Sequence, residues 1–512
     1  MSIPATIIAT MHAPPTRRFI GGGGERSDWI EWRADLLGDS PPEGLRQRAG
    51  KLLYNLRSEA EGGQGPTQRD LRRARLLAAA KRFDFIQLEG KRDLDHAILV
   101  SIPPLRRVIC WHGLATSATA LGHMLASFRR AEARLYRFVT MTDEVGAALA
   151  PIQFLAATAR RDVIAYAESD NAAWTRPLAA RFGAPLVFGN IANGSRSALA
   201  NLDTMVRDYG LPDLHRVTEI CAIVGQPIDG SLSPQLHNAA YRAQGASRLF
   251  VRFPAASFGV FWHGVVQPAL FETIGIHVRG VSVASPHKES ALAVSAEISA
   301  ISRKTESTNV MVRRRSDWYA DTTDPYGVLM NLAGRGIACS GRRVAVIGCG
   351  GSGRPIAAAL RRAGAQVTLV NRSVPRGVWA SQLLRLPFVA LTEFTVAEYD
   401  MIINATPVGK EGEELPVDFS LVPSKSVVID LVFSSCATPL STMARRCGHT
   451  VIDGRDILLV QAARQYYLMT GETMPVNLAR RLLGLPDAIA HNGATASGHH
   501  NRPNGRLSFA NF

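Results

Sequence analysis

Lysine is scarce in this sequence: only seven of its 58 basic residues are lysines, and none lies between Lys91 and Lys288. Arginine stays protonated and cannot act as an amine nucleophile, so residues 92–287 hold no side chain that could form a Schiff base. The six cysteines include no CxxC pair, and the 13 histidines include no HExxH motif. These absences argue against a disulfide framework and a zinc site, and we expect no bound metal.

Long apolar runs are also missing. No stretch reaches the ~18 to 20 residues of a membrane helix, and the start, MSIPATIIATMHAPP, lacks the charged and long apolar regions of a secretory signal. The formal net charge is +15, yet the basic clusters at 69–75 and 312–317 are short and typical of a solvated helix face and a hairpin end. We therefore expect a cytoplasmic protein that binds neither membranes nor nucleic acid.

What is present is an ordinary globular composition: 46% of the 512 residues are hydrophobic and 20% are charged, which suits about three domains. Up to about residue 210, short β-rich runs alternate with helical stretches. In order, the eight runs are IIATM, DWIEWRAD, LLYNLRS, FDFIQLEG, RVICWHG, LYRFVTM, DVIAYAE and PLVFGNI. This alternation predicts an α/β fold that begins with a parallel (β/α)8 barrel over residues 1–212, with its chemistry at the carboxyl ends of the strands.

Two further α/β units follow a linker at 210–217. The first runs over 218–322, and we expect the helix near 455–485 to complete it. The second runs over 323–454, where GRRVAVIGCGGSGRPIAAALRRAGAQVTLVNRS has the strand, glycine turn, helix and strand order of a Rossmann dinucleotide-binding domain. The tail at 487–512 is rich in Gly, Asn, Ser and His, and we expect it to be disordered.

The glycine turn predicts the cofactor. Its glycines, which follow an apolar strand and open an amphipathic helix, are Gly348, Gly350, Gly351 and Gly353. Such a turn lets the backbone approach a pyrophosphate at the helix N-terminus. At the end of the next strand, where an NAD enzyme would carry an acidic residue, the chain reads Asn371-Arg372-Ser373. An arginine there favours a 2′-phosphate, so we expect NADP.

Several motifs in a fixed order resemble shikimate dehydrogenase over residues 218–485. They are VGQPIDGSLSPQLHNAAY, VSVASPHKE, STNVMV, DTTDPYG, the glycine turn, NRS, INATPVG and GRDILLVQAARQYYLMTG. Lys288 and Asp324 can hold, deliver and accept a proton, and an ammonium beside a carbonyl stabilises the alkoxide that hydride transfer creates. The resemblance implies that this pair is catalytic and that a two-domain unit reduces 3-dehydroshikimate to shikimate for aromatic amino-acid biosynthesis.

The resemblance also implies binding residues. The shikimate contacts would be Ser231, Ser233, Asn309 and Gln461, with Gln465 one helical turn further on the same side. Besides the glycines, the cofactor site would include Asn371, Arg372, Ser373 and Thr406. Two departures leave the exact ligand open, because the family's usual threonine is Ala284 here and its expected tyrosine is Phe433. Each change removes a hydroxyl near the substrate.

Residues 5–200 resemble type I 3-dehydroquinate dehydratase, the preceding enzyme of the same pathway. The residues that match its site are Glu31, Arg33, Arg57, Glu61, His112 as general acid/base, and Arg176 as carboxylate clamp. That family forms an imine with a lysine on the strand after the histidine strand, where this chain has Arg137. The family's glutamine-bearing late loop is also replaced by the shorter NGSRSALANL. We expect a barrel without Schiff-base activity that supports the fold or binds a dehydroquinate-like acid weakly.

The sequence favours an NADP-dependent shikimate dehydrogenase fused to a dehydratase-like barrel, with a small-molecule substrate as its partner: shikimate or 3-dehydroshikimate, or else dehydroquinate or quinate. The alternatives are a fully bifunctional enzyme, a quinate dehydrogenase and a degenerate metabolite-sensing regulator. Lys288, Asp324 and the glycine turn argue against a regulator, because a sensor has no need of a proton-transfer pair beside a cofactor site. The sequence does not indicate an oligomeric state.

Overall fold

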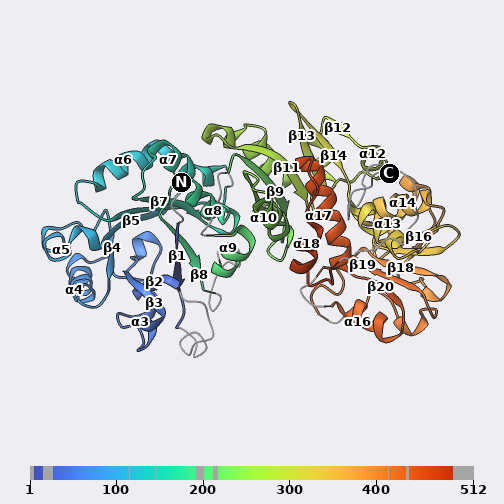
Figure 1. The fold of residues 1–512 in the computed structure, drawn as a ribbon, viewed down its shortest axis with the longest axis horizontal. Coiled ribbons are helices and arrows are strands. Elements are labelled where there is room, and N and C mark those ends of the chain that lie inside the picture. The colour runs from blue at the N-terminus through green and yellow to red at the C-terminus, as the bar shows by residue number, and fades with distance from the viewer. Residues whose placement is uncertain are drawn as a thin grey trace, which may run out of the picture. The chain divides into compact units, whose positions relative to one another are not determined.

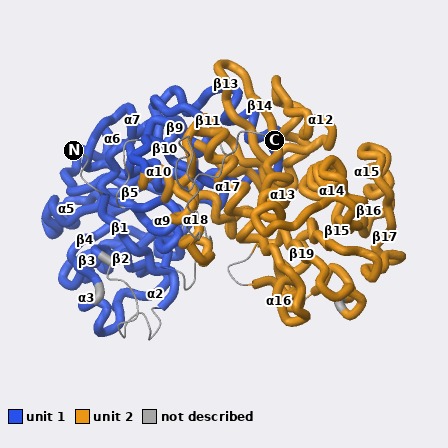
Figure 2. Tube along the Cα trace, turned by 45° about the vertical axis from the view of Figure 1, so that its right-hand side comes forward, with its two compact units in different colours: residues 1–220, 244–278 blue, residues 221–243, 279–512 orange. Residues whose placement is uncertain are grey.

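A computed structural model describes residues 5–14, 27–114, 116–144, 146–191, 201–211, 217–412, 414–433 and 437–487. The chain divides into two compact units, which Figure 2 colours separately. Unit 1 holds residues 1–220 and 244–278, and unit 2 holds residues 221–243 and 279–512. None of the described helices has both the length and the apolarity needed to cross a lipid bilayer. Apart from its first residue, the tail expected to be disordered lies outside the described residues.

Unit 1 is built on eight parallel strands that curl into a nearly closed barrel (Figure 1). They are β1 (Thr6–Met11), β2 (Ser27–Arg33), β3 (Ala49–Asn55), β4 (Phe85–Glu89), β5 (Arg107–Leu114), β6 (Leu135–Met141), β7 (Val163–Glu168) and β8 (Leu186–Asn190). Their order is β7-β6-β5-β4-β3-β2-β1-β8. Each of the eight β-rich runs forms one strand, so the predicted barrel is confirmed.

Helices follow the barrel strands. They are α2 (Ala34–Leu37), α3 (Leu45–Arg48), α4 (Arg69–Ala79), α5 (His96–Ser101), α6 (Ala118–Phe128), α7 (Ala150–Thr158), α8 (Thr175–Arg181) and α9 (Leu202–Tyr209). The basic cluster at 69–75 begins α4, but the prediction of a solvated face is wrong for Arg72, whose side chain is 1% exposed. Its Nε and Nη2 donate to the two carboxylate oxygens of Asp93 at 2.8 and 2.7 Å. A buried charge of this kind is stable only when it is paired in this way.

Alternate residues along the barrel strands face the interior. Towards the amino ends these residues are apolar and form one buried cluster that includes Ile8, Trp29, Leu53, Phe85, Val108, Leu135, Ile164 and Leu186. Two residues further along, the inward positions of β2, β3, β6 and β7 carry Glu31, Asn55, Arg137 and Tyr166. The period of two therefore delivers a set of polar side chains to the carboxyl end of the barrel.

Unit 1 also includes residues 244–278, which contain β10 (Arg248–Pro254) and α11 (Phe258–Phe261). The ring of Trp174, the residue before α8, contacts Phe253, with centroids 4.9 Å apart. Arg252 donates to Asp208 of α9 at 2.7 Å, and both side chains are at most 2% exposed. A buried ion pair and aromatic packing thus hold β10 to the last two barrel helices.

Unit 2 contains a mixed sheet and a parallel sheet. The mixed sheet includes β9 (Glu219–Gly225), β11 (His277–Val283), β13 (Val310–Arg314), β14 (Asp317–Asp321) and β12 (Glu297–Ile298), in that order. Helices α10 (Ser233–Ala243), α12 (Ala300–Thr305), α17 (Gly454–Thr470) and α18 (Val476–Leu482) belong to the same unit. Strands β13 and β14 pair antiparallel, with Arg314 opposite Asp317, so the hairpin end expected at 312–317 is confirmed.

The parallel sheet has the order β17-β16-β15-β18-β19-β20. Its strands are β15 (Arg343–Ile347), β16 (Gln366–Asn371), β17 (Phe388–Ala390), β18 (Met401–Asn404), β19 (Val427–Asp430) and β20 (Thr450–Ile452). Its helices are α13 (Asp324–Gly334), α14 (Gly353–Arg362), α15 (Val374–Leu384) and α16 (Pro439–Arg446). This strand order is that of a Rossmann domain, whose ligand site lies where the order reverses, here between β15 and β18. The predicted Rossmann fold is confirmed.

Candidate active site

The glycine turn lies at the reversal point of the parallel sheet, between the end of β15 and the start of α14. Gly348 has φ +106°, which only glycine adopts readily, and a Cβ on Gly353 would lie 1.8 Å from the Gly348 carbonyl oxygen. A Cβ on Gly350 would meet nothing within 4 Å, so open space borders the turn there. A closely packed turn beside open space and a helix N-terminus fits a dinucleotide pyrophosphate.

The other predicted cofactor residues surround this turn. The Asn371 side chain accepts from the Cys349 amide at 3.1 Å and donates to the Ser373 carbonyl at 2.9 Å. Arg372 is exposed at the end of β16. The Thr406 hydroxyl donates to Asn404 at 2.6 Å, and its methyl group would be 3.0 Å from a Cβ on Gly348. The structure thus brings these predicted residues around one turn.

Lys288 and Asp324 form a close ion pair in unit 2. Lys288 Nζ donates to Asp324 Oδ2 at 2.6 Å and to the Ser352 hydroxyl at 2.7 Å. Ser352 belongs to the glycine turn, and a Cβ on Gly351 would lie 2.8 Å from Lys288 Cβ. The lysine head group therefore lies directly beside the turn expected to bind the cofactor.

Amide side chains fix the carboxylate of the pair. Asn309 Nδ2 and Gln461 Nε2 each donate to Asp324 Oδ1 at 2.8 Å. Asp324 is the first residue of α13, and Gln461 lies on α17. Since both oxygens of Asp324 are occupied, the carboxylate has one defined orientation and keeps Lys288 at a fixed position.

A cavity of about 300 Å³ opens beside this pair. Of the predicted substrate residues, those that line it are Ser231, Ser233, Asn309, Gln461 and Gln465. Gln465 donates to Thr323 at 3.2 Å and accepts from the Ser282 hydroxyl at 2.6 Å, which makes Ser282 a polar lining residue that the sequence analysis missed. Ala284 and Phe433 also line the cavity, so both departures from the family pattern face it.

A second set of charges, also missed from the sequence, lies next to the glycine turn. Glu289 accepts from Arg354 at 2.9 Å and from Arg376. Burial would raise the pKa of Glu289, but Arg376 and Arg354 together lower it. The detectable signal was a second arginine, Arg376, shortly after Arg372, and it lies in the first turn of α15.

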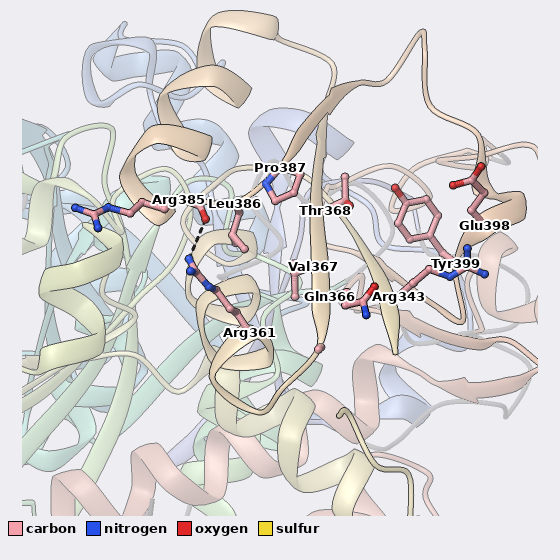
Figure 3. A pocket seen from close by; sticks show the side chains of 11 residues that line it. Arg343, Arg361, Gln366, Val367, Thr368, Arg385, Leu386, Pro387, Glu398 and Tyr399 are labelled. Atoms are coloured by element: carbon pink, nitrogen blue, oxygen red, sulfur yellow. Dashed lines mark hydrogen bonds between the residues drawn. The ribbon is translucent and has the colours of Figure 1, made fainter. Parts of the chain in front are cut away.

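A larger cavity, of about 440 Å³, lies at the opposite edge of the parallel sheet (Figure 3). Arg343 and Gln366, the first residues of β15 and β16, line it together with the Arg361 side chain. Arg361 donates to the main-chain carbonyls of Leu384 and Arg385, both at 2.8 Å. Open α/β sheets bind their ligands at the carboxyl ends of the strands, so this position does not favour a cofactor.

In the barrel, Arg137 lies at the centre of the predicted dehydratase-like site. Its Nη1 donates to Glu31 and, at 3.0 Å, to Gln87, and its Nη2 donates to the Tyr166 hydroxyl. The guanidinium carbon is 3.6 Å from the Phe188 ring centroid. Arg137 thus contacts residues of β2, β4, β7 and β8 and occupies the middle of the barrel.

Glu31 accepts further hydrogen bonds from Thr10 at 2.7 Å and Asn55 at 2.8 Å. Burial would raise its pKa, but Arg137, Thr10 and Arg33 together lower it. Arg33 makes a bidentate contact with Asp35, at 2.8 and 2.7 Å, beside this cluster. Glu31 is therefore an ionised partner of Arg137 and not a free acid.

His112 and Glu61 form a second buried contact in the barrel. His112 Nδ1 is 3.0 Å from Glu61 Oε2, which also accepts from the His112 amide at 2.9 Å. Burial, followed by repulsion from Glu89, raises the pKa of Glu61 to about 8. Burial, followed by repulsion from Arg57, holds the pKa of His112 well below its usual range. Burial therefore disfavours the charged form of both members of the pair.

Glu61, Cys110 and His112 each offer one ligand atom, and these atoms lie within 4.8 Å of one another. Burial raises the pKa of the Cys110 thiol well above its usual value, so the thiolate that a metal would need is disfavoured. Arg57 and Arg137 repel positive charge at His112. The charges around the cluster argue against a cation there.

The sequence analysis missed Glu168, the last residue of β7. Its carboxylate pairs with Arg57 at 2.9 Å and with Arg176 at 3.5 Å. Burial would raise its pKa, but Arg57, Arg176 and Arg137 lower it to about 2. The detectable signal was an acidic residue two positions after Tyr166, on the inward face of the strand. The late loop at 193–202, in which the sequence lacks a glutamine, lies largely outside the described residues.

Comparisons with known proteins match the two halves of the chain to different families. Residues 223–311 match the family model for the shikimate dehydrogenase substrate binding domain. A shikimate dehydrogenase (NADP(+)) of Symbiobacterium thermophilum is 31% identical over 276 residues, which cover 51% of this chain and 92% of that protein. The chain belongs to the shikimate dehydrogenase family. A shikimate dehydrogenase (NADP(+)) of Thermococcus kodakarensis is 33% identical over 262 residues, which cover 50% of this chain and 92% of that protein.

Residues 23–213 match the family model for type I 3-dehydroquinase. This chain of the shikimate dehydrogenase family therefore carries a type I 3-dehydroquinase domain before its dehydrogenase part. Among solved structures, shikimate 5-dehydrogenase from Thermus thermophilus with NADP(H) and shikimate is 27% identical, with a TM-score of 0.46, and covers 52% of this chain and 98% of its own. Dehydroquinate dehydratase and shikimate dehydrogenase from S. pombe is 17% identical, with a TM-score of 0.43, and covers 94% of this chain and 98% of its own.

Proposed function

We propose that unit 2 catalyses the NADP-dependent interconversion of 3-dehydroshikimate and shikimate. The observation that carries this proposal is the ion pair of Lys288 and Asp324, which lies between a polar cavity and the glycine turn. NADP supplies the hydride acceptor for shikimate oxidation. We assign cofactor binding to residues 323–454 and substrate binding to residues 218–322 with the helix near 455–485. A substrate and cofactor of this metabolic type favour a cytoplasmic location.

The geometry indicates how the chain's own residues act. Lys288 Nζ, held by Asp324 and Ser352, carries the proton that the substrate oxygen accepts during reduction and releases during oxidation. Its positive charge stabilises the alkoxide that forms while the hydride moves. The hydroxyls of Ser231 and Ser233 and the amides of Gln461 and Gln465 offer donors and acceptors to a hydroxylated ring acid in the cavity.

The test is an absorbance assay of NADPH formation with shikimate and NADP. Lys288→Ala and Asp324→Asn should each lower turnover by ~10²-fold or more, the scale of positioned acid/base catalysis, while NADP binding is largely kept. Lys304→Ala, at an exposed position of α12, is the matched control and should leave turnover unchanged. Near-normal turnover in both Lys288 and Asp324 variants would remove the pair from the mechanism.

For unit 1 we propose a barrel without Schiff-base activity. Arg137 supports this proposal, because a guanidinium cannot form an imine. In addition, its guanidinium donates hydrogen bonds to Glu31, Gln87 and Tyr166 of the surrounding strands. Removing one partner of a buried ion pair leaves an uncompensated charge, so we infer a structural role for Arg137. Full bifunctionality would require another amine at this site, and none of the barrel's three lysines, Lys51, Lys81 and Lys91, lines the cavity around Arg137.

A further inference from the structure

Two arginines of the barrel, Arg57 and Arg176, face the same carboxylate, that of Glu168. Glu168 Oε2 lies 2.9 Å from Arg57 Nη1, and Glu168 Oε1 lies 3.5 Å from Arg176 Nη2. One carboxylate thus faces two guanidinium groups, each through a different oxygen. Paired guanidiniums are the usual protein ligands of a carboxylate, whether it comes from a substrate or from the chain itself.

Both arginines also make contacts in the barrel that do not involve Glu168. Their side chains are 8% and 5% exposed, respectively. Arg57 Nε donates to the Glu61 carbonyl at 2.7 Å, and Arg176 Nη1 donates to the Phe188 carbonyl at 2.7 Å. The Arg176 guanidinium also lies 4.7 Å from the Tyr166 ring centroid. The two arginines are therefore positioned for a carboxylate even when Glu168 is not one of their contacts.

One polar atom at this site still lacks a contact. Arg176 Nε is buried and has no hydrogen-bond partner among the described residues. A buried donor without a partner is costly in a folded protein. A carboxylate that is not attached to β7 could take more orientations against Arg176 than the Glu168 side chain can. The unpaired Nε therefore indicates that Glu168 satisfies only part of the hydrogen-bonding capacity of this site.

Little space is left for an acid at this site, and Glu168 already pairs with both arginines. The cavity lined by these residues is only about 10 Å³, enough for about one water molecule. The arginines lower the pKa of Glu168 to about 2, so its carboxylate remains charged at any pH near neutrality. A hydroxylated ring acid would have to displace a charged group of the same sign from the same two arginines.

We propose that Glu168 is an internal ligand that occupies the carboxylate site formed by Arg57 and Arg176, so that the barrel excludes carboxylic acids. The barrel is closed to the ring acids of the dehydrogenase reaction, and truncation of residue 168 opens a site for a carboxylate. This inference does not depend on the activity of unit 2, because it concerns contacts within the barrel alone.

The first experiment uses acetate as the probe, because it carries a carboxylate and is small enough to replace the missing side chain. In the full-length Glu168→Ala protein, acetate should raise the thermal midpoint of the barrel by about 2 to 4 °C at saturation, compared with sodium chloride at equal ionic strength. The wild-type protein should not respond. Circular dichroism of each variant is the control for correct folding.

Two matched variants make the test specific. The double variant Glu168→Ala, Arg176→Ala should lose the acetate response, because one of the two arginines is gone. Asp70→Ala removes a carboxylate that is 89% exposed and paired with Arg73 on α4, and it should also show no response. A response in Asp70→Ala equal to that of Glu168→Ala would attribute the effect to general anion binding and would overturn the proposal.

A second measurement counts sites. Titration calorimetry with acetate should give one more site per chain in Glu168→Ala than in the wild type, and that site should disappear in the double variant. If Glu168→Ala does not fold, Glu168→Gln keeps the side-chain volume without the charge and should show a weaker acetate response. Equal acetate stabilisation of wild type and variants, or none in any variant, would overturn the proposal.

Discussion

At the scale of single residues, Arg372 is the position expected to choose between the two nicotinamide cofactors. It lies exposed at the end of β16, beside the glycine turn. Replacing Arg372 with alanine should weaken NADP binding by ~1.5 to 3 kcal/mol, typical of a charged hydrogen bond, and barely affect NAD. Fluorescence titration with both cofactors measures this difference. Equal losses for NADP and NAD would show that Arg372 does not contact the 2′-phosphate.

Ala284 is the residue through which substrate choice can be tested. It lines the cavity beside Lys288 and is in close contact with Gly225, where an added Cβ would lie 2.7 Å from that of Ala284. A threonine hydroxyl at this position would donate a hydrogen bond to the substrate acid, and its absence should reduce the binding free energy by ~1 to 3 kcal/mol. The smaller alanine side chain also leaves room for the extra hydroxyl of quinate. Weak shikimate affinity and detectable quinate turnover are therefore expected.

The measurement is kcat/KM for shikimate and quinate in the natural protein and in Ala284→Thr. The variant should shift the ratio towards shikimate. If the ratio stays the same, position 284 does not determine substrate choice.

At the scale of elements, two substitutions in the glycine turn between β15 and α14 should distinguish the role of the turn in folding from its role in cofactor binding. A Cβ on Gly353 would lie 1.8 Å from the Gly348 carbonyl oxygen, so Gly353→Ala should distort the turn and lower the free energy of unfolding by ~1 to 3 kcal/mol. A Cβ on Gly350 would meet no protein atom within 4 Å. Gly350→Ala should therefore keep the stability but weaken NADP binding, since the methyl group enters the space beside the turn.

Urea unfolding and NADP titration of the two glycine variants distinguish these effects. Equal losses of stability in the two variants would contradict the prediction that only Gly353→Ala affects folding. Retained NADP affinity in Gly350→Ala would mean that the pyrophosphate does not approach the turn at this residue.

The sequence predicted the elements well because their signals are local. Eight apolar runs of strand length and one glycine turn after VAVIG are each readable within a few residues, and the structure has a strand for each run. The cluster at 69–75 was misjudged because the burial of Arg72 depends on Asp93, 21 positions away. Neither residue alone indicates that they pair under α4.

At the scale of the whole molecule, a barrel of the 3-dehydroquinase family is joined to a dehydrogenase but has Arg137 where an imine-forming lysine is expected. Incubation of the intact protein with dehydroquinate and borohydride should give no covalent adduct, and dehydration should remain at background. Intact-mass spectrometry measures the adduct directly. A mass increase mapped to any residue of the barrel would contradict the prediction.

A rescue experiment complements this result. Arg137→Lys alone should not restore dehydration, because Glu168 still occupies the two arginines and Glu31 loses part of its bonding to the guanidinium. Appearance of dehydratase activity in Arg137→Lys would show that the barrel retained its remaining machinery.

The sequence by itself determined the barrel, the Rossmann order, the glycine turn and the missing lysine, because periodicity, turn chemistry and the absence of a residue type are local properties of the chain. Only the tertiary structure decided which charged side chains form pairs. Arg57 and Glu168 are 111 positions apart, and Lys288 and Ser352 are 64 apart, yet each pair is in hydrogen-bond contact. Which buried charges pair depends on strand order and on the inward facing of alternate residues, and these are fixed only when the whole barrel and the whole of unit 2 are packed.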